Sequence, residues 1–105
     1  MDMGFQGSIA IGGAFPLATV CRNGSLVPTA PSAAPNYSIY PPGFSSATAS
    51  GSLGSSDTDS KTRFRTGSVT ASAGNGFASG TLYTVVYTYA ISSTNYTNTA
   101  TFLVT

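Results

Sequence analysis

The chain has 105 residues, a formal net charge of +1 and only 7% charged residues. Its length fits a single domain, and its 41% of hydrophobic residues is too high for a disordered chain. Four Lys and Arg residues do not make the basic stripe that nucleic-acid binding requires. Ser, Thr, Gly and Ala make up more than half of the chain, and no stretch keeps a helical period. We therefore expect β-structure with tight turns.

The first half of the chain has short strand signals separated by turn residues. Gly12-Gly13 and Asn23-Gly24 mark two of these turns, and the second is a strong hairpin dipeptide. Three prolines in 28–35 predict a loop or an extended edge. We expect strands at 5–11, 14–22, 25–27, 36–40 and 48–53, with 54–56 flexible.

The second half predicts one long strand over 58–73, possible bending at Gly67, and a final hairpin of 82–91 and 96–104. No charged residue follows Arg65. The pattern gives about seven short strands and predicts an all-β fold, an antiparallel β-sandwich of the immunoglobulin-like class. The N-terminus has no positively charged segment, and Gly12, Gly13 and Pro16 interrupt its apolar run. We therefore expect no signal peptide, no transmembrane helix and no membrane partner.

The first strand of the final hairpin is apolar or aromatic on much of both faces. Alternation puts four core-type residues on one face and five residues on the other; these are Tyr83, Val85, Tyr87 and Tyr89, and Leu82, Thr84, Val86, Thr88 and Ala90. Two interpretations stay open. A neighbouring subunit covers the second face, or tyrosine serves simply as a good strand former with a solvated hydroxyl.

Tyr83 stands near the start of the penultimate predicted strand. An immunoglobulin-like domain keeps a tyrosine corner there, in which the Tyr hydroxyl bonds to the preceding backbone. We expect the Tyr83 hydroxyl to close the preceding turn in this way.

The titratable residues are too few for catalysis or metal binding. The chain has no His and no Glu, and its only carboxylate side chains are Asp2, Asp57 and Asp59. No base is available to activate a Ser, Thr or Cys nucleophile, and zinc lacks its usual ligands. Cys21 is the only cysteine and is expected to be a buried, inert thiol. The sequence predicts no enzyme, no cofactor and no metal.

Five of the seven charged residues fall within nine positions. They alternate with uncharged residues, and they are Asp57, Asp59, Lys61, Arg63 and Arg65. In an extended segment all five point one way and Phe64 points to the core. The strip is either a solvated strand face or a contact strip for a neighbour, acidic at one end and basic at the other; we predict the contact.

With this strand pattern, the chain resembles the small immunoglobulin-like structural proteins of tailed bacteriophages, including head decoration, or cement, proteins. The resemblance is carried by CRNGSLVPTAP (21–31), NYSIYPPG (36–43), NGFASGTLYTVVYTY (75–89) and TATFLVT (99–105). It implies a non-enzymatic protein, made in the host cytoplasm, that sits on the outer capsid surface and clamps neighbouring capsomers. The implied partners are the major capsid protein and other copies of the chain in a homo-oligomer, with a trimer as one state considered.

A second function stays open. The chain is alternatively an immunoglobulin-like binding module of a phage fibre or tail, or of a cell-surface filament, that contacts a host surface or carbohydrate through its tyrosines. In either case we expect residues 1–8 to form an N-terminal arm, with Phe5 as its anchor and an intermolecular contact holding it, and residues 9–105 to form one domain.

Overall fold

The computed structural model describes residues 3–44, 46–56, 62–65 and 69–105. Within them the chain is all-β, with ten strands, one short 3-10 helix and no α-helix. The elements are β1 (Met3–Ile9), β2 (Ala14–Phe15), β3 (Ala18–Val20), β4 (Asn36–Tyr40), β5 (Ala49–Ser52), β6 (Ser55–Ser56), β7 (Arg63–Arg65), β8 (Val69–Thr70), η1 (Ala73–Asn75), β9 (Thr81–Ile91) and β10 (Thr94–Val104).

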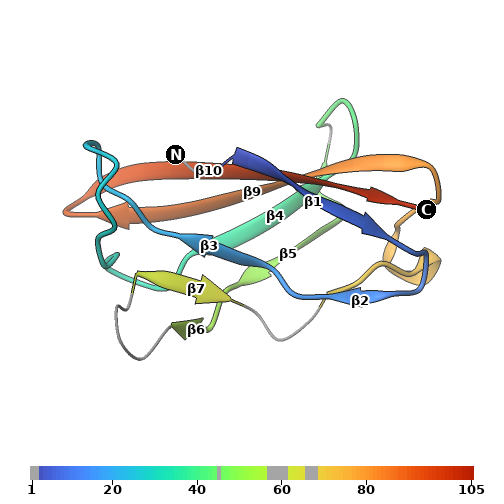
Figure 1. The fold of residues 1–105 in the computed structure, drawn as a ribbon, viewed down its shortest axis with the longest axis horizontal. Coiled ribbons are helices and arrows are strands. Elements are labelled where there is room, and N and C mark those ends of the chain that lie inside the picture. Colours follow the sequence, from blue (N-terminus) through green and yellow to red (C-terminus); the bar gives the residue numbers. More distant parts are fainter. Residues whose placement is uncertain (1–2, 45, 57–61, 66–68) are drawn as a thin grey trace.

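The strands form one large sheet and two small ones. The large sheet has the order β1-β10-β9-β4-β5, and the small sheets have the orders β2-β8 and β3-β7-β6. Figure 1 shows β2, β3, β6 and β7 together on one side of the long β9–β10 hairpin. Within the described residues, no helix has the length and apolar character needed to cross a membrane.

The long hairpin of β9 and β10 is the predicted final hairpin. Its strands are antiparallel, with Ile91 opposite Thr94, so the turn is only two residues long. Ser92 and Ser93 have φ angles of 50° and 68°, which are the left-handed values of a type I′ turn. That turn matches the twist of the flanking strands, and the hairpin is therefore tighter than the four-residue connection predicted.

The N-terminal segment differs most from the prediction. β1 runs parallel to β10, with Phe5 opposite Thr101 and Ile9 opposite Val104. The large sheet is therefore mixed, and the prediction of an antiparallel fold is wrong for this strand. Residues 3–8, expected as an arm, lie along β10 because the last strand has an open edge whose backbone groups need partners. The register shifts between Phe5 and Gly7, where Gly7 has a φ of 102°, as in a β-bulge.

Three other expected strands are divided or absent. The expected strand 14–22 breaks at Pro16 into β2 and β3, which belong to different sheets, because proline has no N–H for a ladder. The expected strand 58–73 is likewise β7 and β8 in different sheets. Residues 25–27 form no strand; a single bridge joins Arg22 and Pro28, and Leu26 turns with a φ of 62°. Conversely, the 54–56 stretch predicted to be flexible contains β6.

The core lies between the inner side of the large sheet and the small sheets. The side chains of β9 predicted to share one face, Tyr83, Val85, Tyr87 and Tyr89, are buried, as are Ala100, Phe102 and Val104 of β10. Phe15 of β2 packs on Phe102 with ring centroids 4.7 Å apart. Most of these buried side chains form one cluster with residues of β4 and β8, and Phe64 of β7 packs against it. Tyr89 instead belongs to a second cluster with Cys21 and Ile91. The predicted alternation of the final hairpin is confirmed.

Candidate functional site

The two arginines of the predicted charged strip lie on β7. Arg63 and Arg65 are exposed, while Phe64 between them is partly buried and packs against the core. The alternation predicted for these three positions is confirmed. Asp57, Asp59 and Lys61 lie outside the described residues.

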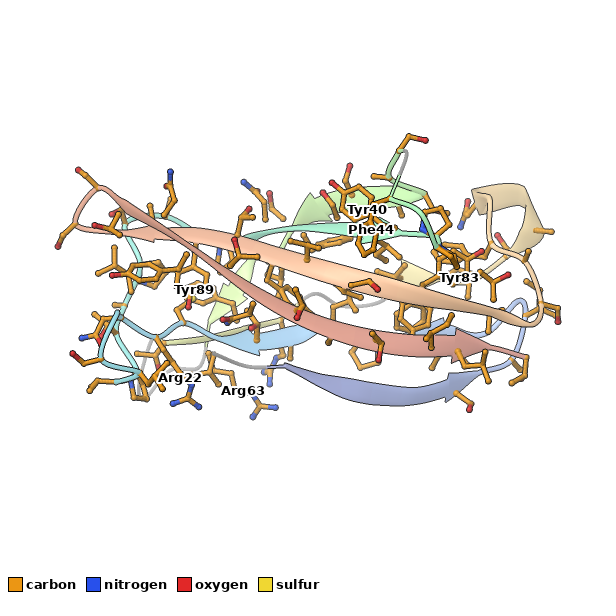
Figure 2. The ribbon with its side chains drawn as sticks, turned by 90° about the horizontal axis from the view of Figure 1, so that it is seen from above. Arg22, Tyr40, Phe44, Arg63, Tyr83 and Tyr89 are labelled. Carbon is orange, nitrogen blue, oxygen red and sulfur yellow. The ribbon has the colours of Figure 1, made fainter. Side chains whose placement is uncertain are left out.

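A third arginine joins them from a distant part of the sequence. β3 pairs with β7 so that Val20 faces Arg63 and Ala18 faces Arg65. Arg22 follows Val20 by two positions, so it shares the outward side of this small sheet. Figure 2 shows Arg22 and Arg63 close to each other and pointing to the same side of the molecule. We call Arg22, Arg63 and Arg65 the arginine face.

Buried hydrogen bonds hold β3 and Arg22 in place. The Arg22 backbone N–H donates to Tyr89 Oη at 2.9 Å, and this hydroxyl donates to the Arg22 carbonyl at 3.0 Å. Asn98 of β10 is only 1% exposed. Its Nδ2 donates to Thr19 Oγ1 at 2.9 Å and to the Val20 carbonyl at 2.8 Å. Two residues of the long hairpin thus fix β3 and Arg22, and β3 in turn pairs with β7, which carries Arg63 and Arg65.

The opposite side of the molecule has a different chemistry. None of the residues in the five strands of the large sheet, all within the described part of the chain, is charged. The outward side chains of β4, β9 and β10 bear hydroxyls or amides or are apolar, and they are partly or fully exposed; they include Asn36, Ser38, Thr84, Val86, Thr88, Asn95, Thr97, Thr99 and Thr101. We call this outward side of the large sheet the uncharged face. No described strand lies over this face. Both interpretations of its outward residues therefore remain open: a neighbouring subunit covers them, or they are strand residues exposed to solvent.

One end of the uncharged face is apolar. Phe44 follows the turn after β4 and is 53% exposed, and its ring lies against Tyr40 with centroids 5.3 Å apart (Figure 2). Leu82 at the start of β9 is 47% exposed and pairs with Leu103 of β10. We call Tyr40, Phe44, Leu82 and Leu103 the apolar end.

The other end of the large sheet has a pocket of about 460 Å³ beside the β9–β10 turn. The 32–34 loop, whose Ser32 N–H donates to the Ala90 carbonyl at 2.9 Å, forms one wall. Tyr89 and Tyr96 also border the pocket. Its polar lining is uncharged and consists of Ser32, Asn36, Thr88, Asn95 and Thr97.

Phe5, the predicted anchor of the arm, lies on β1 at the edge of the large sheet and far along the chain from the arginines. Phe5 thus belongs to a different sheet from Arg63 and Arg65, which lie on β7. Sequence reasoning missed Arg22, because its place depends on the pairing of β3 with β7. It also missed the apolar end, although PPGF (41–44) is a visible turn signal followed by an aromatic residue.

Comparison of the chain with protein-family models, with curated proteins and with solved structures found no match.

Proposed function

We propose that the chain is a non-enzymatic structural protein of a virus particle, an immunoglobulin-like β-sandwich that binds the outer capsid surface as a decoration, or cement, protein. Its partners are the major capsid protein and other copies of the chain. In this role it stabilises contacts between capsomers at the surface of the virion.

The predicted tyrosine corner supports the immunoglobulin-like class. Tyr83 is 2% exposed, and its hydroxyl accepts a hydrogen bond from the Ala78 backbone N–H at 2.8 Å. The bond closes the turn just before β9, the penultimate strand, where immunoglobulin-like domains have it. The two-layer arrangement is supported by the core, which is built from inward residues of the large sheet together with Phe15 and Leu17.

The observation that carries the proposed role is the separation of charge. Among the described residues, every charged side chain belongs to the arginine face, and the uncharged face lies across the core from it. A protein free in solution generally mixes charge over its surface. A subunit fixed in a lattice instead meets different neighbours on its two sides. Arginine is well suited to contact a neighbouring subunit, because its planar guanidinium group forms two parallel hydrogen bonds with a carboxylate.

The test is a binding titration onto shells of the parent particle that lack this protein. We expect wild type to bind more weakly as salt is added, because ionic contacts are screened, and Arg63→Gln/Arg65→Gln to bind weakly with little salt dependence. Arg63→Glu/Arg65→Glu should bind still more weakly. The matched control is Ala73→Glu/Ser79→Glu, which changes net charge by the same amount as the Gln pair at two exposed positions near η1. Equal binding of wild type and the Gln pair at both salt levels would refute the role of the arginine face.

A second candidate function is the binding of an uncharged carbohydrate by a fibre or surface module. The observation that favours it is the pocket beside the β9–β10 turn, whose hydroxyl and amide groups offer both donors and acceptors to sugar hydroxyls. Saturation-transfer NMR with neutral oligosaccharides of the host surface tests it. Signals that disappear in Thr88→Val/Asn95→Ala support this function, and signals that persist place the sugar elsewhere.

A further inference from the structure

The apolar end stands out because exposed apolar and aromatic side chains converge there from three segments. Leu82 and Leu103 are directly opposite each other on β9 and β10. Tyr40 on β4 faces Thr84, which puts it diagonally across from Leu82 on the same face of the sheet. Phe44 adds its ring to Tyr40. Phe44 and Leu82 are exposed, and Tyr40 and Leu103 are partly exposed. A group of neighbouring apolar side chains of this kind marks an interaction site more often than scattered single residues do.

The backbone is held in an unfavourable conformation to present Phe44. Its φ is 55°, a left-handed value that is uncommon for a bulky residue with a β-carbon. The turn is closed by the Phe44 N–H, which donates to the Pro41 carbonyl at 3.2 Å. Glycine would fit this position without strain, yet the chain has an aromatic side chain there that remains 53% exposed. One side of the ring packs on Tyr40 of the same chain, and its exposed side is available for contact with a partner.

From this geometry we infer that the uncharged face, centred on its apolar end, binds a second copy of the chain face to face. A partner with a charged surface is disfavoured, because its charges would lose water against a sheet that offers no counter-charge. Serine and threonine hydroxyls both donate and accept hydrogen bonds, so a face rich in them is complementary to itself. In a twofold dimer each surface meets its own copy, and a face without charge brings no like charges together. The inference is independent of whether the chain binds a capsid.

The experiment measures self-association of the full chain by sedimentation equilibrium, from micromolar to near-millimolar concentration. We expect wild type to form a dimer in this range. Leu82→Asp should raise the dimer dissociation constant by about tenfold or more, since it buries a charge without a partner. The matched control is Leu26→Asp, because Leu26 is 61% exposed and lies on the loop after Arg22 rather than in the apolar end. This control should dimerise like wild type.

A second variant separates docking from folding. Phe44→Gly removes the ring and also relieves the left-handed strain, so the monomer should unfold at the same or a higher denaturant concentration while dimerisation weakens. A wild type that stays monomeric throughout the range would overturn the inference. So would a dimer that Leu82→Asp and Phe44→Gly leave unchanged. If the protein is a monomer in solution and Leu82 is shielded from solvent only on assembled particles, the uncharged face binds another protein. That result would also refute binding of a second copy.

Discussion

Replacement of Asn98 by alanine should destabilise the fold more than any other single polar truncation in the described core. Asn98 is almost fully buried, and its amide joins β10 of the large sheet to β3 of a small sheet. The bonded residues are 78 and 79 positions apart in the chain. The amide therefore links β3 and β10, two strands that are far apart in the sequence. Asn98→Ala removes both of these hydrogen bonds at once, together with the longer bond of 3.5 Å that Asn98 Oδ1 accepts from the Tyr89 hydroxyl.

The magnitude follows from the groups that lose a partner. A buried polar group without a partner costs about 1–3 kcal/mol. The bond to the Val20 carbonyl is only partly buried, and the Thr19 hydroxyl oxygen loses a neutral donor, so each falls at the lower end of that range. We expect a total loss of about 2–3 kcal/mol in the free energy of unfolding. For a domain of this size the melting temperature should fall by about 10–20 °C.

The assay is urea unfolding followed by circular dichroism and by tyrosine fluorescence. The control is Asn36→Ala, the same substitution at an exposed position of the same sheet, where Asn36 Oδ1 accepts from the Ser52 hydroxyl at 2.8 Å; it should cost under about 0.5 kcal/mol. A double-mutant cycle with Thr19→Val should show coupling, because the two side chains share one hydrogen bond. An Asn98→Ala loss no larger than that of Asn36→Ala would refute the view that this amide holds β3 in place.

Three further substitutions test local features, each by chemical denaturation. Tyr83→Phe removes the acceptor of the Ala78 N–H and should cost about 1 kcal/mol; an unchanged midpoint would mean that water replaces the bond. Ser92→Asn/Ser93→Gly supplies the residues that a type I′ turn prefers and should stabilise the protein by about 1 kcal/mol, whereas a loss would show that the turn differs from the observed angles. Gly51→Ala puts a β-carbon 2.9 Å from the hydroxyl of the facing tyrosine on β4 and should cost about 1 kcal/mol; a gain in stability would mean that the ring moves aside freely.

Local patterns predicted the parts of the fold that depend on neighbouring residues. Alternation along the final hairpin predicted which residues of β9 and β10 share a face, because side chains of a strand alternate between faces. It did not predict which of the two faces is buried. The Tyr83 bond was predictable for a similar reason, since its partner is only five residues away. The same alternation placed Arg63 and Arg65 outward with Phe64 inward.

Pairings between distant segments were not accessible from the sequence. The parallel alignment of β1 with β10 joins the two ends of the chain, and neither segment carries a local signal for it. Arg22 reaches the arginine face through the register of β3 with β7, and Asn98 reads in the sequence as one more polar residue of a Thr-rich strand. In each case tertiary packing determined which segments contact each other, and it overrode the structural preference of the local sequence. The split of 14–22 at Pro16 was a local signal that the length of the apolar run obscured.

The central claim is that this chain works as a fixed component of a particle rather than as a free protein. Its most direct measurement is the copy number and position of the protein on purified particles, by quantitative mass spectrometry together with cryo-electron microscopy. The proposal predicts a constant ratio to the major shell protein and density for this fold on the outer surface at local symmetry axes, with the arginine face toward the shell. Protein recovered only outside particles, or a ratio that varies between preparations with no ordered density, would contradict it.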